Sequence, residues 1–127
     1  MDIINGGGAS SFTNDGTFTR TGTGSSDVTV VFINNANLRL GSGGMHFFSS
    51  LTNDGTMTAA GALLQIKNGI TGTGALDVGS GGTVLLTTGK DGGQTLDFLA
   101  GSGALDLATP AAFAGTIEGF KHGNLSI

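Results

Sequence analysis

The chain has 127 residues, of which 11% are charged, with a formal net charge of −4 and no cysteine. This length allows one domain with a buried core. The few basic residues are dispersed, which argues against a nucleic-acid partner, and no apolar run approaches the ~20 residues of a membrane span. Without cysteine there is no disulfide framework, thiolate nucleophile or zinc–thiolate site.

The polar part of the composition is dominated by small uncharged side chains. Glycine, threonine, serine and asparagine together supply 60 of the 127 residues. Glycine and threonine are poor in helix interiors, whereas glycine allows backbones to turn often and to approach closely. The composition therefore predicts an all-β protein rather than a helical one.

Apolar residues alternate with their neighbours along most of the chain. The alternation first appears around Val28–Phe32 and recurs to Leu105–Leu107. A period of two predicts short strands with one buried face, and glycine-rich turns follow most of them. In chain order, the predicted core positions are Val28, Val30, Phe32, Leu38, Leu40, Leu64, Ile66, Leu76, Val78, Leu96, Phe98, Leu105 and Leu107.

Two motifs repeat at nearly the same spacing. The run NDGT at Asn14–Thr17 returns 39 residues later at Asn53–Thr56, and LRLGSGG at Leu38–Gly44 returns 38 residues later as LDVGSGG at Leu76–Gly82. The Asn-Gly and Asp-Gly pairs could join antiparallel hairpins, but hairpins give no reason for such a repeat. A β-solenoid does, because equivalent positions of successive coils stack. We therefore expect about six coils of roughly 19–20 residues.

The solenoid makes further expectations about individual positions. Asn14 and Asn53 fall at equivalent corners, where stacked amides hydrogen-bond along the axis; ordinary turn asparagines are the alternative. The run GALD occurs at Gly74–Asp77 and Gly103–Asp106, and this offset of one and a half coils places the copies on different faces. Residues Phe113–Ile127 are expected to form a strand, a turn and a final strand.

Three runs resemble a known group of proteins. NDGTFT and NDGTMT, GTGALDVGSGGTVLL, and FAGTIEGFKHGNLSI resemble coils of bacterial autotransporter passengers and of filamentous haemagglutinin-like repetitive surface proteins. The resemblance implies a right-handed parallel β-helix, a secreted or bacterial cell-surface location, and a stalk or adhesin role. It carries over no catalytic residue. We interpret residues 1–127 as a single β-solenoid segment and as a fragment of a larger repetitive protein.

The acidic residues Asp77, Asp97 and Asp106 each lie between two inward-facing apolar residues and should face outward. Solubilising charge is the ordinary role of such residues. Polysaccharide lyases and hydrolases of the β-helix type instead use outward carboxylates as acid, base or calcium ligands. That alternative requires a groove, whereas these turns are short and only Arg39 and His46 are candidate neighbours. We therefore expect no catalytic residue and no enzyme.

Two other kinds of site receive little support from the sequence. His46 and His122 lack partners at metal-ligand spacing, and Gly89–Phe98 is a poor match to a calcium-binding nonapeptide, so we expect no metal or cofactor. Thr-x-Thr pairs such as Thr17/Thr19 and Thr56/Thr58 leave an ice-binding face as an alternative. The coil between those two pairs has no such pair, so the array is interrupted.

Five apolar residues should face outward if the alternation holds: Val31, Ile33, Phe48, Leu63 and Leu85. They mark a contact patch or, alternatively, a shifted register that turns some of them inward. Together these features predict a non-catalytic structural segment, a stiff rod serving as stalk, adhesin or filament subunit. Its expected partner is another copy stacked end to end, because open solenoid ends expose strand edges, or a ligand on a host or cell surface.

Overall fold

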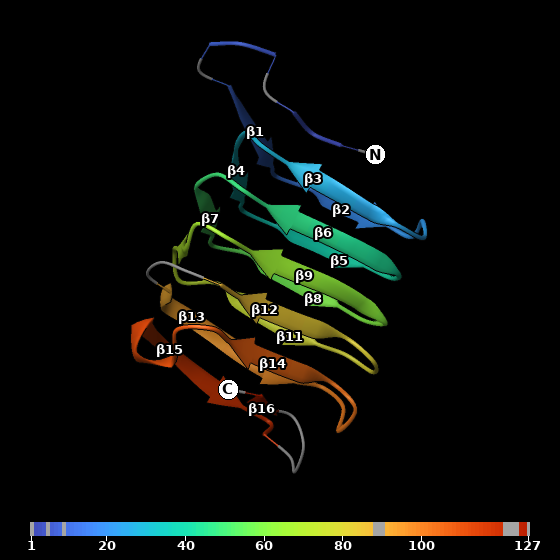
Figure 1. Ribbon diagram of the computed structural model, residues 1–127, viewed down its shortest axis with the longest axis vertical. Coiled ribbons are helices and arrows are strands. Elements are labelled where there is room, and N and C mark those ends of the chain that lie inside the picture. The colour runs from blue at the N-terminus through green and yellow to red at the C-terminus, as the bar shows by residue number, and fades with distance from the viewer. Residues whose placement is uncertain (1, 5, 9, 88–90, 121–124, 127) are drawn as a thin grey trace.

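The chain folds as a stack of parallel β-coils (Figure 1). The computed structural model describes residues 2–4, 6–8, 10–87, 91–120 and 125–126. In Figure 1 the strands lie tier upon tier from the N-terminal end to the C-terminal end. Every strand pairing in these residues is parallel. The solenoid prediction is thus confirmed, and the antiparallel hairpin alternative is wrong.

Strands from successive coils stack into three columns. The first column contains β1 (Ser11–Asn14), β4 (Val31–Asn34), β7 (Leu51–Asn53), β10 (Ile70–Thr71) and the start of β13 (Asp91–Phe98). The second contains β2 (Thr17–Arg20), β5 (Asn37–Leu40), β8 (Thr56–Ala59), β11 (Ala75–Val78), the end of β13, and β15 (Phe113–Glu118). The third contains β3 (Ser25–Val28), β6 (Gly43–Phe47), β9 (Ala62–Ile66), β12 (Thr83–Leu86), β14 (Ala104–Leu107) and β16 (Leu125–Ser126).

The coils lengthen toward the C-terminal end. Ser11 pairs with Val31, 20 residues later, whereas Ile70 pairs with Asp91 after 21 residues and Asp91 pairs with Phe113 after 22. The corner before β13 and the 3₁₀ turn Pro110–Ala112 take up the extra residues. The solenoid therefore has about five turns, and the prediction of about six coils of 19–20 residues was too high.

The core runs along the axis of the stack. All thirteen predicted core residues are buried, with exposures of 7% or less. In the second column, for example, Leu38 pairs with Met57, which pairs with Leu76 and then with Leu96. The two copies of GALD contribute to β11 and β14, which belong to different sheets, as the offset predicted. Alternation along each strand thus becomes continuous apolar ladders across the coils.

A column of amides runs through one corner of the stack. Asn14 donates to the side-chain oxygen of Asn34 at 2.8 Å, and Asn34 donates to that of Asn53 at 2.8 Å. Asn53 in turn donates to the side-chain oxygen of Gln94 at 2.9 Å. The predicted stacking of Asn14 and Asn53 is therefore confirmed, with Asn34 as the rung between them.

Gln94 spans a missing rung of this amide column. Residue Gly72 lies at the corner between Asn53 and Gln94, where a Cβ atom would come within 2.5 Å of the Asn53 carbonyl oxygen. The longer side chain of Gln94 reaches back and donates to the carbonyl oxygens of Asn53, Thr71 and Gly72 at 2.9, 3.1 and 3.0 Å. The ladder continues because glutamine has one more methylene than asparagine.

A buried arginine organises the first full coil. Arg20 occupies the inward position that Leu40 occupies one coil later. Its guanidinium donates to the hydroxyl of Ser26 and to the carbonyl oxygens of Gly22, Gly24 and Ser42, at 2.6–3.0 Å. A buried charge is tolerated only when its donors are satisfied, so Arg20 fixes the turn between β2 and β3.

Candidate functional site

The three predicted acidic residues do not converge. Asp77 on β11 pairs directly with Asp97 on β13, and Asp97 pairs with Glu118 on β15. Asp106 lies on β14 in the other sheet, where its neighbours in register are Leu85 and Ser126. The structure therefore places two of the predicted carboxylates in one column, adds Glu118, which the sequence reasoning missed, and separates Asp106 from them.

This carboxylate column, Asp77–Asp97–Glu118, has a distinct electrostatic character. Neighbouring strands are ~4.8 Å apart, so like charges directly opposite one another repel. Partial burial, and secondarily the charge of Asp97, raise the pKa of Asp77 above its ordinary value. Above Asp77 the same column continues with Thr58 and then Arg39. Arg39 is therefore a neighbour of the column, as expected, but it lies two coils from Asp77.

His46 has an acidic partner that the sequence reasoning missed. Its Nδ1 atom lies 3.2 Å from Oδ1 of Asp27, which pairs with it in register on the preceding coil. The 19-residue offset between them is one coil, so the repeat length was the signal that could have found the pair. His46 lies in the third column, away from Asp77. His122 lies outside the described residues.

A metal site is not formed by the described histidine and acidic side chains. Among the residues that the structure describes, no group of three or more His, Asp or Glu side chains is placed to hold a metal ion. The run Gly89–Phe98, considered as a calcium loop or a plain turn, forms strand β13 from Asp91 onward; Gly89 and Lys90 lie outside the described residues.

The outward apolar residues are placed as predicted. Val31 and Phe48 are exposed, while Ile33, Leu63 and Leu85 are half-buried. They are divided between two sheets, because Val31 and Ile33 belong to β4 whereas Leu63 and Leu85 belong to β9 and β12. Phe48 is in contact with Lys67, whose Nζ atom lies 4.4 Å from the ring centroid, a cation–π interaction.

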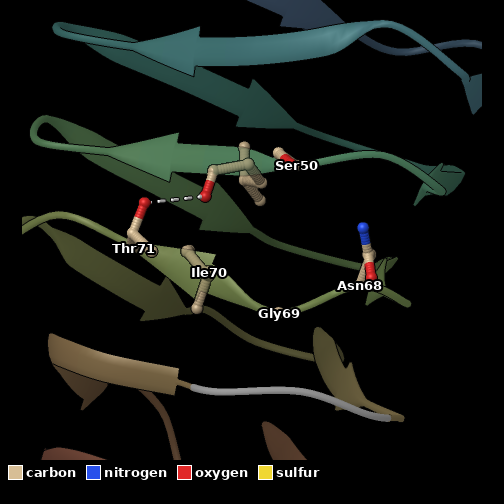
Figure 2. Close-up of a pocket in the computed structure, with 6 residues that line it drawn as sticks. Ser50, Asn68, Gly69, Ile70 and Thr71 are labelled. Atoms are coloured by element: carbon tan, nitrogen blue, oxygen red, sulfur yellow. Dashed lines mark hydrogen bonds between the residues drawn. The ribbon is translucent and has the colours of Figure 1, made fainter.

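A small hollow lies at the corner that joins the third column to the first. Figure 2 shows its lining, and its volume is about 200 Å³. No lining residue is titratable, and the polar atoms belong to Ser50, Asn68, Thr71 and the backbone. The Thr71 hydroxyl donates to the Leu51 carbonyl oxygen at 3.5 Å. The lining residues are Ser50, Leu51, Asn68, Gly69, Ile70 and Thr71.

The threonine pairs stack as expected but do not form an unbroken array. Thr17 and Thr19 lie two coils above Thr56 and Thr58, and Asn37 and Arg39 occupy the coil between them. Below Thr58 the column changes to carboxylates. The charged side chains therefore interrupt the regular hydroxyl face that ice binding would require.

Comparison with known proteins assigns no family to this chain. No protein-family model, no curated protein and no solved structure matches it. Within the described ranges, no helix has the length and apolar character needed to cross a lipid bilayer. The functional argument therefore depends on the solenoid itself and on the charges and apolar groups that it displays.

Proposed function

We propose that the chain is a non-catalytic structural and adhesive segment of a secreted or cell-surface bacterial protein. Its function in this proposal is geometric: stacked coils form a stiff element that presents its faces and corners to a partner. The bacterial surface location comes from the sequence resemblance, and the parallel β-solenoid fits a rod-like structural role.

The observation that carries this proposal is the continuous in-register stacking of the coils. Apolar ladders fill the interior, and the amide column ties one corner together from Asn14 to Gln94. In a repeat protein each unit contacts only its neighbours, so stability is distributed along the axis and the structure resists bending. Such a body is suited to spacing and display.

The two ends of the stack support self-association of this segment. Phe12 and Phe18 at the N-terminal end, and Phe113 and Ile117 at the C-terminal end, are only partly buried against the core. Another copy placed on the stack would continue the ladder from Ile117 to Phe18 and pair the open strand edges. Unpaired strand edges favour such addition, so we propose end-to-end stacking into fibres.

Fibre formation is tested by concentrating the chain and examining it by electron microscopy and fibre diffraction. End-to-end stacking predicts fibres with a ~4.8 Å repeat along their axis. The variant Ile117→Lys should abolish them, because it places a charge in the joint. Glu118→Lys, its outward-facing neighbour, is the matched control and should leave the fibres intact. A chain that stays unassociated at every concentration contradicts the stacking.

The surface location and adhesive role need a separate test. Antibodies against the chain should label intact source cells as strongly as permeabilised ones, and the purified chain should bind host or bacterial surfaces saturably. Labelling that requires permeabilisation would contradict the location, whatever the outcome of the fibre experiment.

One observation favours a polysaccharide lyase or hydrolase as the second candidate. Asp77 and Asp97 are adjacent in register, and the pKa of Asp77 is raised above its ordinary value. Paired carboxylates in unequal environments are what acid–base cleavage of a glycan uses. Turnover of acidic polysaccharides that disappears in both Asp77→Asn and Asp97→Asn, but persists in Asp106→Asn, would establish this alternative over the structural role.

A further inference from the structure

The second column presents an outward face whose charges are arranged symmetrically. Its centre is Thr58 on β8, which pairs with Arg39 on one side and with Asp77 on the other. One coil further out lie Thr19, above Arg39, and Asp97, below Asp77. A cation and an anion therefore lie at equal distances from Thr58, at the same position along their strands.

Neither charge is neutralised within the part of the chain that the structure describes. Arg39 is exposed, Asp77 is half-buried, and the charged groups nearest them in the column are each other, across Thr58, and Asp97. The raised pKa of Asp77 has the same origin, since burial and Asp97 both oppose its ionisation. A cation placed opposite Asp77 would relieve both effects.

The rest of this face allows close approach. The outward residues in the neighbouring position along the strands are Thr17, Asn37, Thr56, Ala75 and Thr95. None of these is longer than asparagine, so no bulky side chain holds a partner surface away from Arg39 and Asp77. The surface is therefore suited to face-to-face contact with another sheet.

Two copies of this face can be related by a two-fold axis in two simple ways. An axis parallel to the stack sets every residue against its own copy, so Arg39 faces Arg39 and Asp77 faces Asp77, which is repulsive. An axis parallel to the strands through Thr58 reverses one stack relative to the other. Arg39 of each copy then faces Asp77 of the other, and Thr19 faces Asp97.

We propose that a second copy of this chain docks on this face, antiparallel, with the two-fold axis at Thr58 and two reciprocal Arg39–Asp77 ion pairs. An isologous contact of this kind uses the same patch twice and closes at a dimer. It differs from end-to-end stacking, which is open-ended and uses the two ends of the stack.

The size of the face sets the strength of this dimer. Five strands ~4.8 Å apart, each of four residues at ~3.3 Å, give a footprint of roughly 300 Å² per copy. This is well below the ~800 Å² per partner of a standard stable interface. The dimer is therefore weak, forms at high protein concentration, and weakens further as salt screens the ion pairs.

Charge reversal tests the pairing directly. Sedimentation equilibrium over increasing concentration should show a monomer–dimer equilibrium for the wild type at low salt. Arg39→Asp makes both positions acidic and Asp77→Arg makes both basic, so each variant alone should remain monomeric. An equimolar mixture of the two should form a 1:1 dimer, because each then supplies the charge that the other lacks.

The double variant Arg39→Asp with Asp77→Arg should also dimerise as the wild type does, and Asp106→Arg, an equal charge change on the other sheet, should not affect the equilibrium. Circular dichroism establishes that each variant is folded. A wild-type chain that stays monomeric, single variants that dimerise unchanged, or a mixture that does not associate overturns the proposal. An open-ended series of oligomers that survives charge reversal would support end-to-end stacking and overturn the face-to-face dimer.

Discussion

The amide column and the carboxylate column pass through the same stack and respond to it in opposite ways. Asn14, Asn34 and Asn53 meet in register at a buried corner, and each joins the next by a hydrogen bond of 2.8 Å. Asp77 and Asp97 also meet in register, on an outward strand face, and the contact raises the pKa of Asp77. The geometry is shared, but the chemistry is not.

The difference lies in what each side chain offers to a copy of itself. An amide has donors and an acceptor, so identical groups stacked at ~4.8 Å satisfy one another. An ionised carboxylate has acceptors only and a charge that repels its neighbour. In-register stacking therefore amplifies the self-complementarity of a side chain, whether that is favourable or unfavourable.

The largest expected effect concerns the close approach of coils on which both columns depend. A Cβ atom at Gly55 would lie 2.0 Å from the carbonyl oxygen of Ala36, whereas one at Gly16, the equivalent residue of the other NDGT motif, meets nothing within 4 Å. Gly55→Ala should lower the free energy of unfolding by about 3 kcal/mol, as severe overpacking does. Gly16→Ala should change it by less than about 1 kcal/mol. Urea denaturation measures both, and equal effects would contradict this account of the stacking.

Breaking the amide column should have the next largest effect. Asn34 is fully buried, accepts from Asn14, and donates to Asn53 and to the carbonyl oxygens of Ala36 and Thr56. Asn34→Ala leaves several of these groups unsatisfied and should cost about 2–4 kcal/mol of unfolding free energy.

The control for this variant is the adjacent residue. Asn35 is exposed and bonds only at the surface, to Asp15 at 2.7 Å, so Asn35→Ala should cost less than about 1 kcal/mol. Similar midpoints of urea denaturation for the two variants would mean that the buried amides do not stabilise the stack.

Gln94 tests whether the ladder depends on side-chain length. In Gln94→Asn the amide remains but is one methylene too short to span the coil of Gly72 and reach Asn53. We expect a loss of about 1–3 kcal/mol, the cost of leaving buried polar groups unpaired. Thermal unfolding followed by circular dichroism measures it, and an unchanged midpoint would show that Gln94 is not a rung of the column.

The smallest effect concerns the carboxylates. Because the pKa of Asp77 is raised in the folded state, Asp77 contributes stability that is fully present below its unfolded-state pKa and is lost as pH rises through its folded-state pKa. Asp77→Asn should therefore stabilise the chain at pH 7, by about 0.5 kcal/mol since the site is partly exposed and screened.

The matched control is Asp106→Asn, which removes a carboxylate that has no acidic neighbour in register. Unfolding is measured at low protein concentration, where no Arg39–Asp77 dimer forms. The advantage of Asp77→Asn over wild type should disappear as the pH falls through the folded-state pKa of Asp77. An advantage that persists in acid, or that Asp106→Asn reproduces, would contradict this account.

The positions of the core and the stacking of the motifs could be predicted because both are periodic. Alternation gave the inward residues from Val28 to Leu107, and the repeat of NDGT gave the equivalence of Asn14 and Asn53. Sequence reasoning missed Asp27 beside His46 and Glu118 beside Asp97, since both partners lie about one coil away and belong to no repeated motif. The coil count was too high because the corners near β13 and Pro110 are longer than those in the repeats.

The sequence by itself determined that the chain is all-β, that it coils, and which side chains point inward, because these properties follow from local alternation and from a repeat length. Only the tertiary structure decided which side chains meet across coils: Gln94 reaching over Gly72, Asp77 against Asp97, and Arg39 and Asp77 on either side of Thr58. These contacts depend on the number of residues in every intervening corner. A change of one residue in a corner shifts the register of the following coil, and no local pattern fixes that number.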